Sequence, residues 1–319
     1  MTRQVGVHES VGELFEPAAV ARAFDRAGGA TEIGEPEAVD VAVVGDDSEE
    51  LGALGVCVTL AYDEAFLDSG LRWVHSVQTG VDRFPTAAFE QEGVSLTSSE
   101  GIHGDIVGET VLGYLLSFAR GLHRFRDAQR EAHWSDPDWS ELGTLQGERV
   151  CVIGLGTLGQ GVTRRADAFG MEVIGVRRTP TPVDGVKTVY TPANLEAAIG
   201  GSKFVVLCVP LTESTRGLIG REELAAMDED ASLVNVARGA VVDEGALVEA
   251  LDAGEIAGAA LDVSEAEPLD PESPLWGFEE VLVTLHAATH DTYVDCVVDI
   301  VRENLRRTET GDPLANRVA

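Results

Sequence analysis

The chain has 319 residues, 44% of them hydrophobic, which is enough for one large or two ordinary globular domains. Its apolar runs are far shorter than the roughly 18–20 residues of a membrane-spanning helix, and the acidic N-terminal stretch does not predict a secretory signal. Lys and Arg number 23 against 55 Asp and Glu, a formal net charge of −32. We therefore expect a cytoplasmic protein that binds neither nucleic acid nor anionic membranes.

The acidic balance is extreme, and only two of the basic residues are lysines, Lys187 and Lys203. Such charge repels itself and opposes compaction unless counterions screen it, and the Debye length shortens from about 10 Å at 0.1 M salt to about 3 Å at 1 M. We hypothesise a halophilic protein from a high-salt cytoplasm. The alternative is an ordinary acidic protein, whose stability would be the same in dilute buffer and in molar KCl.

The cysteines stand apart in the sequence, without the Cys-x-x-Cys or Cys/His spacing of a zinc site or a disulfide framework. They are Cys57, Cys151, Cys208 and Cys296. Three of them lie inside apolar runs, so we expect buried reduced thiols and no metal site.

Short apolar runs alternate with amphipathic stretches along the chain. Before residue 100 they predict strands at 4–8, 41–45, 55–60, 71–77 and 94–97. From Arg149 onward they predict strands at 150–154, 172–176, 203–209, 232–236, 256–263 and 281–286. This alternation is typical of parallel sheets with βαβ crossovers, and eleven strands suit two sheets better than one.

Two longer segments have helical patterns. Residues 105–134 predict one long helix whose first half is apolar almost all round and is therefore expected to be buried. After His290 the apolar residues recur at helical spacing, which predicts a packed terminal helix. They are Val294, Val297, Val298, Val301 and Leu305.

The sharpest local motif is Gly154-Leu155-Gly156-Thr157-Leu158-Gly159, which follows a predicted strand and precedes a helical run. Glycines at these positions permit a tight turn and close approach of the backbone to a pyrophosphate, which then faces the N–H groups of the helix start. The motif predicts a dinucleotide-binding site. The alternative is a purely structural glycine turn.

The end of the next strand indicates which dinucleotide binds. An acidic residue there would bond the adenosine ribose and select NAD. Here the strand ends in Arg177-Arg178, and two guanidiniums suit a 2′-phosphate. We predict NADP(H), with NAD(H) bound more weakly. In the alternative, the two arginines are solvated and paired with nearby carboxylates.

Three polar residues lie at or just past the carboxyl ends of predicted strands: Arg238, Asp262 and His286. Ligands bind at the carboxyl ends of the strands in open α/β sheets, so these residues are expected at one site. Glu267 stands in the loop beyond Asp262.

Seven segments in order make the chain resemble the D-specific 2-hydroxyacid dehydrogenase family over nearly its whole length. They are SVQTGVDRF, GDIVGETVL, GLGTLGQGV, CVPLTESTRGLI, NVARGAVVDEGAL, ALDVSEAEPL and TLHAAT. We predict an α/β fold of two doubly wound parallel-sheet domains. A Rossmann cofactor domain, 99–288, is inserted in a flavodoxin-like substrate domain, 1–98 plus 289–319, with hinges near Ser98 and Ala288.

The resemblance implies a role for each site residue. Arg238 grips the substrate carboxylate, His286 exchanges a proton with the C2 oxygen, and Glu267 hydrogen-bonds the imidazole and raises its pKa. Asp262 holds the nicotinamide carboxamide. Further substrate contacts are Thr79 and Gly80, and further cofactor contacts are Cys208, Val209, Pro210 and Ala237.

The expected activity is therefore NADP(H)-dependent interconversion of 2-oxo acids and D-2-hydroxy acids by hydride transfer at C2. The family resemblance implies a homodimer, and the apolar helix from Asp105 is its expected interface. Around His286 the chain departs from the family pattern: Leu285 replaces the usual proline, and Ala287 and Ala288 replace two glycines. These departures bear on pocket shape and substrate preference.

Plainer interpretations of the site residues stay open. His286 could be a hydrogen-bonded turn residue, Arg238 half of a surface ion pair, and Asp262 a residue that closes a turn. Glu265 could take the role of Glu267. At the level of function, the alternatives are a formate or phosphite dehydrogenase of the same superfamily and a nucleotide-sensing module like the C-terminal-binding-protein corepressors. A panel of 2-oxo acids would separate these from the predicted enzyme.

Overall fold

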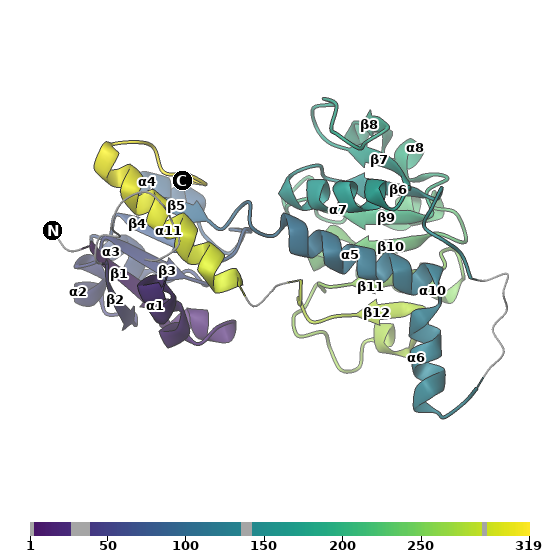
Figure 1. Ribbon diagram of the computed structural model, residues 1–319, viewed down its shortest axis with the longest axis horizontal. Helices are drawn as coiled ribbons and strands as arrows, with labels where there is room; N and C mark the ends of the chain where they lie inside the picture. Colours follow the sequence, from purple (N-terminus) through teal and green to yellow (C-terminus); the bar gives the residue numbers. More distant parts are fainter. Residues whose placement is uncertain (1–2, 27–38, 135–141, 289–291) are drawn as a thin grey trace. The chain divides into compact units, whose positions relative to one another are not determined.

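The computed structural model describes residues 3–26, 39–134, 142–288 and 292–319. The chain divides into two compact units, Met1–Ile102 with His290–Ala319 and His103–Thr289 (Figure 1). Residue 289, where the second segment of the substrate domain is expected to begin, lies outside the described residues. No helix in the described ranges is long and apolar enough to cross a membrane.

The first unit is built on a five-stranded parallel sheet in the order β2-β1-β3-β4-β5. This is the strand order of a flavodoxin-like sheet. The strands are β1 (Arg3–His8), β2 (Val39–Val44), β3 (Val56–Thr59), β4 (Trp73–Ser76) and β5 (Ser95–Ser98). Every residue of β3 and β4 is buried, as expected for strands that carry helices on both faces.

Helices cover both faces of this sheet. Phe24 and Val298 belong to one buried cluster, and Phe66 and Phe89 to another. The helices of the first cluster are α1 (Pro17–Arg26) and α11 (Tyr293–Thr310). Those of the second are α2 (Ser48–Gly52), α3 (Ala65–Asp68) and α4 (Thr86–Glu92), and the 3-10 helix η1 (Glu9–Glu13) follows β1.

The terminal helix is confirmed. Four residues of its predicted stripe are buried on α11, and the fifth, Val294, is half-buried. Beyond α11 the chain returns to the edge of the sheet, where the Val318 N–H donates to the Leu96 carbonyl and the Leu96 N–H to the Ala319 carbonyl. These bonds satisfy backbone groups of β5 that an open sheet edge would expose.

The second unit contains a seven-stranded sheet in the order β12-β11-β10-β9-β6-β7-β8, with every pair parallel. Its first six strands in chain order, β6 to β11, have the Rossmann arrangement 3-2-1-4-5-6. They are β6 (Arg149–Ile153), β7 (Glu172–Val176), β8 (Thr188–Tyr190), β9 (Phe204–Leu207), β10 (Ser232–Asn235) and β11 (Gly258–Leu261), and β12 (Val281–Val283) follows.

Alternate residues of β6 show that both faces of this sheet are covered. Val150 and Val152 pack in a cluster with α5 (Gly104–Ala119) and α7 (Thr157–Ala168). Cys151 and Ile153 pack in the opposite cluster. That cluster includes α8 (Leu195–Ile199), α9 (Arg221–Ala225) and α10 (Glu244–Asp252). In Figure 1, α5 and α7 lie side by side. The predicted class of fold, two doubly wound parallel sheets, is confirmed.

The prediction of one helix over 105–134 is wrong. The chain forms α5 and then a separate helix, α6 (Leu122–Arg130), because Gly121 adopts a left-handed conformation with φ of 61°. A left-handed residue ends the hydrogen-bonded ladder, and glycine adopts it without steric cost.

The strand β8 is not among the predicted strands; it is three residues long and only partly buried. It pairs with β7 at the sheet edge, where a strand needs no long apolar run. In the described part of this unit the remaining short helices are η4 (Pro192–Asn194), η5 (Gly239–Val241) and η6 (Pro274–Gly277).

Candidate active site

The predicted cofactor and catalytic residues of the second unit lie in loops at one edge of the sheet. In a parallel sheet the carboxyl ends of all strands meet at the same edge, which is where ligands bind. In sheet order, the loops carry His286 after β12, Asp262 after β11, Ala237 and Arg238 after β10, Cys208 to Pro210 after β9, Gly154 to Gly159 after β6, and Arg177 and Arg178 after β7.

The glycine motif forms a tight cradle between β6 and α7. Gly154 has a φ of 98°, and a Cβ on it would lie 2.5 Å from the Cys208 carbonyl oxygen. A Cβ on Gly159 would lie 1.9 Å from the Gly154 oxygen, whereas one on Gly156 would meet nothing within 4 Å. The backbone is therefore packed tightly behind the loop and open at Gly156.

The helix after this cradle starts without a side-chain cap. The Gln160 N–H makes the first helical bond, to the Gly156 carbonyl. The N–H groups of Thr157, Leu158 and Gly159 thus have no acceptor within the helix. These free donors and the helix dipole suit an anion, so the residues present fit a dinucleotide pyrophosphate.

Arg177 is half-buried and Arg178 is exposed at the end of β7. Within the described part of the chain, neither guanidinium forms an ion pair, although other arginines of this unit do. The Arg177 N–H donates to the Tyr190 carbonyl of β8, which holds the backbone in place. The alternative that these arginines are tied to nearby carboxylates therefore has no contact to support it.

His286 and Glu267 are brought together from two different loops. His286 Nδ1 lies 3.2 Å from Glu267 Oε2, while Glu265, two positions away, has no such contact. The hydrogen bond with His286 holds the pKa of Glu267 below its ordinary value, against the opposing effect of partial burial. The Ser264 N–H and the charge of Arg238 act in the same direction as His286.

The backbone of His286 is left-handed, with a φ of 53°. This conformation costs a non-glycine residue about 1–2 kcal/mol, so the surrounding structure must impose it. The His286 N–H donates to the Asp262 carbonyl at 2.8 Å. On either side, the Thr284 hydroxyl (2.6 Å) and the Ala287 N–H (2.9 Å) both donate to Asp262 Oδ1.

Asp262 is 2% exposed, and its other carboxylate oxygen accepts the Ala288 N–H at 3.3 Å. Its side chain thus holds the loop 284–288 in place. Asp262 therefore makes the contacts that the alternative interpretation, a residue that closes a turn, requires. The contact of Asp262 with a nicotinamide carboxamide stays a prediction.

Arg238 follows β10 in a loop that Asn235 holds in place. The Asn235 amide donates to the Arg238 carbonyl and accepts the Ala237 N–H, each at 3.0 Å. A Cβ on Gly239 would lie 1.9 Å from the carbonyl carbon of Ser264, so this loop touches the loop that carries Glu267. Arg238, Glu267 and His286 therefore lie in adjoining loops.

Thr79 and Gly80 belong to the first unit, in the loop after β4. The Thr79 hydroxyl donates to the Ser99 carbonyl at 3.0 Å, and the Ser99 N–H donates to the Gln78 carbonyl at 3.1 Å. This loop is therefore tied to the segment that follows β5. The predicted contact of Thr79 and Gly80 with substrate stays a prediction.

A buried chain of hydrogen bonds lies beneath this loop. Trp73 Nε1 donates to Thr97 Oγ1 (2.8 Å), which lies 2.9 Å from His75 Nδ1, and His75 Nε2 lies 3.1 Å from Ser99 Oγ. Ser99 in turn donates to the Ser76 carbonyl. Burial lowers the pKa of His75 to about 3, so the imidazole is neutral in the folded protein.

The neutral His75 should make the protein less stable in acid. An unfolded histidine titrates near about 6.5, so below that pH the unfolded chain binds one proton more than the folded chain. The free energy of unfolding of the wild type should then fall as the pH drops from 6 to 4. This fall should be steeper than that of His75→Gln by about 1.4 kcal/mol per pH unit. Urea unfolding in molar KCl measures both slopes. Equal slopes would contradict the prediction, and His133→Gln, which removes an exposed histidine, should keep the wild-type slope.

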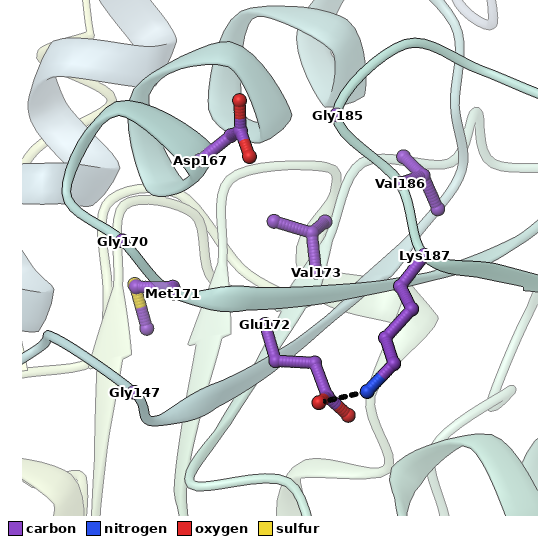
Figure 2. Close-up of a pocket in the computed structure, with 9 residues that line it drawn as sticks. All are labelled: Gly147, Asp167, Gly170, Met171, Glu172, Val173, Gly185, Val186 and Lys187. Carbon is purple, nitrogen blue, oxygen red and sulfur yellow. Dashed lines mark hydrogen bonds and ion pairs between the residues drawn. The ribbon is translucent and has the colours of Figure 1, made fainter.

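A surface depression lies elsewhere on the second unit. It has a volume of about 470 Å³ and is lined by Asp167, Glu172 and Lys187 among others. In Figure 2 the Lys187 ammonium reaches the Glu172 carboxylate. Glu172 is the first residue of β7, so the depression lies at the amino edge of the sheet, and none of the predicted site residues lines it.

No group of His, Cys, Asp and Glu in the described ranges could hold a metal ion. Three side chains that shape the site escaped the sequence analysis: Asn235, Thr284 and Tyr114, whose hydroxyl lies 2.6 Å from that of Thr284. Asn235 and Thr284 stand two positions before the predicted site residues Ala237 and His286, and their position at strand ends was the available signal. Nothing in the sequence pattern distinguishes Tyr114 from a core residue of α5.

A Rossmann-ordered sheet with this cradle and a histidine–carboxylate pair at the same edge defines a dinucleotide-binding oxidoreductase. Residues 112–288, more than half of the chain, match the family model of the D-isomer specific 2-hydroxyacid dehydrogenase NAD binding domain. The chain therefore belongs to the D-isomer specific 2-hydroxyacid dehydrogenase family.

Several relatives support this family assignment. Glyoxylate/hydroxypyruvate reductase B of Pectobacterium carotovorum is 35% identical over 74% of this chain and 77% of its own. Glyoxylate reductase of Thermococcus litoralis is 31% identical over 89% of this chain and 88% of its own. Among solved structures, a D-isomer specific 2-hydroxyacid dehydrogenase of Xanthobacter autotrophicus in complex with NADPH and MES is 32% identical. It covers 100% of this chain and 98% of its own with a TM-score of 0.81.

Proposed function

We propose that the protein is an NADP(H)-dependent reductase of small 2-oxo acids of the glyoxylate and hydroxypyruvate type, which produces D-2-hydroxy acids. The observation that carries this proposal is the His286–Glu267 pair, 3.2 Å apart, in loops that adjoin the loop of Arg238. The names of the relatives from Pectobacterium and Thermococcus supply the substrate class.

The coenzyme preference rests on Arg177 and Arg178. Arg177 and Arg178 at the end of β7 form no ion pair with any residue that the structure describes, and their guanidiniums suit a 2′-phosphate, which accepts charge-assisted hydrogen bonds. NADPH and a 2-oxo acid are both anions, whereas the chain carries a net charge of −32. Binding thus needs local positive charge, which these arginines, Arg238 and the start of α7 supply. The complexes of the Xanthobacter protein with NADPH and of a Sinorhizobium meliloti glyoxylate/hydroxypyruvate reductase with NADP support this preference.

The roles of the three catalytic residues follow from their chemistry. When bound, the reduced nicotinamide supplies the hydride for the keto carbon. Arg238 binds the substrate carboxylate and polarises the carbonyl. His286 gives a proton to the C2 oxygen during reduction and takes it back during oxidation. Glu267 accepts a hydrogen bond from the Nδ1–H of His286, which fixes the tautomer of the imidazole and aims Nε2.

The direct test is a panel of 2-oxo acids of increasing side-chain size, assayed by NADPH and NADH oxidation in molar KCl. We expect turnover with glyoxylate and hydroxypyruvate, faster with NADPH, and a D-configured product wherever C2 becomes a stereocentre. Oxidation of formate or phosphite without turnover of any 2-oxo acid would indicate the other dehydrogenases of the superfamily. Coenzyme binding without turnover of any substrate would indicate a sensing module.

Two further properties belong to this proposal. We propose a homodimer in which the half-buried apolar side chains of α5, Leu112, Leu116 and Phe118, contact a second copy. We also propose that activity needs molar salt, because salt screens the self-repulsion of the acidic surface. Sedimentation and activity measured over a KCl series test both.

A further inference from the structure

A tyrosine from a distant part of the chain reaches the loop that carries His286. Tyr114 lies on α5 and is 7% exposed. Its hydroxyl oxygen lies 2.6 Å from Thr284 Oγ1 and 3.5 Å from Asp262 Oδ1. Thr284 Oγ1 in turn lies 2.6 Å from Asp262 Oδ1. These three side chains form a connected, largely buried group beneath the loop.

The direction of the hydrogen bonds in this group is determined. A carboxylate only accepts, so the Thr284 hydroxyl donates its single proton to Asp262. Thr284 can then only accept from Tyr114, which must be the donor. Burial, and the negative charge of Asp262, raise the pKa of Tyr114 to about 12, so the phenol keeps its proton over the working range of the enzyme.

The Asp262 carboxylate binds residues on both sides of His286 in the sequence. Asp262 accepts from Thr284 before the histidine and from the N–H groups of Ala287 and Ala288 after it. The left-handed backbone of His286 lies between these contacts. A shift of the carboxylate would therefore change the direction in which the imidazole points.

We propose that Tyr114 is a positioning residue for catalysis: its hydroxyl orients Thr284, which fixes the Asp262 carboxylate and, through it, the backbone of His286. The role of His286 as acid and base is taken from the proposed function, on which this inference rests. We assign Tyr114 no contact with the substrate or the cofactor.

The first test is Tyr114→Phe, which removes only the hydroxyl. We expect kcat to fall about fivefold, which corresponds to about 1 kcal/mol, the net contribution of one hydrogen bond. The dissociation constant of NADPH, measured by fluorescence titration, should change less than twofold. The matched control is Thr110→Val, which removes a hydroxyl from the same helix. Among the described residues, that hydroxyl bonds within α5 alone, to the Ile106 carbonyl, so the control should keep the wild-type kcat.

A double-mutant cycle tests whether Tyr114 acts through Thr284. Thr284→Val should lower kcat at least as much as Tyr114→Phe, and the double variant should be no slower than Thr284→Val alone, because both changes break one chain of contacts. Thr284→Ser keeps the hydroxyl and should restore most of the activity. Fully additive losses, or a wild-type kcat in Tyr114→Phe, would overturn the proposal.

A readout without turnover separates this inference from the proposed function. Histidine labelled with carbon-13 at ring carbon ε1 gives one signal per histidine, and His286→Gln assigns the signal of interest. In the cofactor-free protein, Tyr114→Phe should shift or broaden the His286 signal, while Thr110→Val should leave it unchanged. An unchanged His286 signal in Tyr114→Phe refutes the positioning role even if the enzyme is active. A shifted signal in a protein that reduces no 2-oxo acid supports the contact and refutes only the proposed function.

Discussion

Replacement of His286 by glutamine is expected to lower kcat for glyoxylate about 10³-fold, within the range of about 10²–10⁴ that general acid–base catalysis contributes. Glutamine fills a similar volume and can still hydrogen-bond Glu267, but it cannot exchange a proton with the C2 oxygen. The glycine cradle and the arginines after β7 are unchanged, so NADPH binding should stay within twofold of wild type. Steady-state NADPH oxidation and a fluorescence titration measure the two quantities.

Two controls belong to this experiment. His133→Gln makes the same replacement at an exposed position after α6 and should leave kcat unchanged. Glu267→Gln should lower kcat and shift the pH profile of kcat/KM, whereas Glu265→Gln should do neither, because the His286 ring contacts Glu267 and not Glu265. A His286→Gln enzyme that retains a tenth or more of the wild-type kcat would show that another group supplies the proton.

Replacement of Arg177 by aspartate is expected to lower the preference for NADPH over NADH about 100-fold. The change removes a charge-assisted hydrogen bond, worth about 1.5–3 kcal/mol, and places a repelling carboxylate beside the 2′-phosphate. The same carboxylate can accept hydrogen bonds from the ribose hydroxyls of NADH. The ratio of kcat/KM for the two coenzymes, measured at one salt concentration, gives the result.

The control for this prediction must carry the same change of charge, because NADPH has more negative charge than NADH and senses the net charge of the protein. Arg306→Asp on α11 meets that need, since Arg306 pairs with Glu303 at a surface position. It should leave the coenzyme ratio within about twofold, as is usual for a single exposed charge. A coenzyme ratio in Arg177→Asp equal to that of this control would refute the assignment of Arg177 to the 2′-phosphate.

Much of the fold could be predicted because the strands are buried on both faces and therefore read as continuous apolar runs. The runs around Val150, Val205 and Val234 are such cases, and each became a central strand. The terminal helix could be predicted equally well, since apolar residues at the spacing of Val297, Val298 and Val301 indicate a helix that packs by one face.

The wrong predictions of helices and strands occur where the local sequence pattern carries little information about the structure. The edge strand β8 needs few buried residues because only one side of it is paired. The break between α5 and α6 depends on a single residue, Gly121, whose left-handed conformation is compatible with the sequence but not required by it. The residues on both sides of Gly121 suit a helix, so the sequence pattern alone predicts one helix.

The candidate site divides in the same way. The sequence by itself determined the class of fold, the glycine-rich turn from Gly154 to Gly159, and the set of polar residues near the strand ends, because each depends on residue types at short spacing. Only the tertiary structure decided that Glu267 rather than Glu265 meets His286, and that Tyr114 reaches Thr284 and Asp262. Tyr114 and Asp262 are 148 positions apart in the chain. Contacts over such separations arise from the packing of α5 on the sheet, which no local spacing of residues encodes.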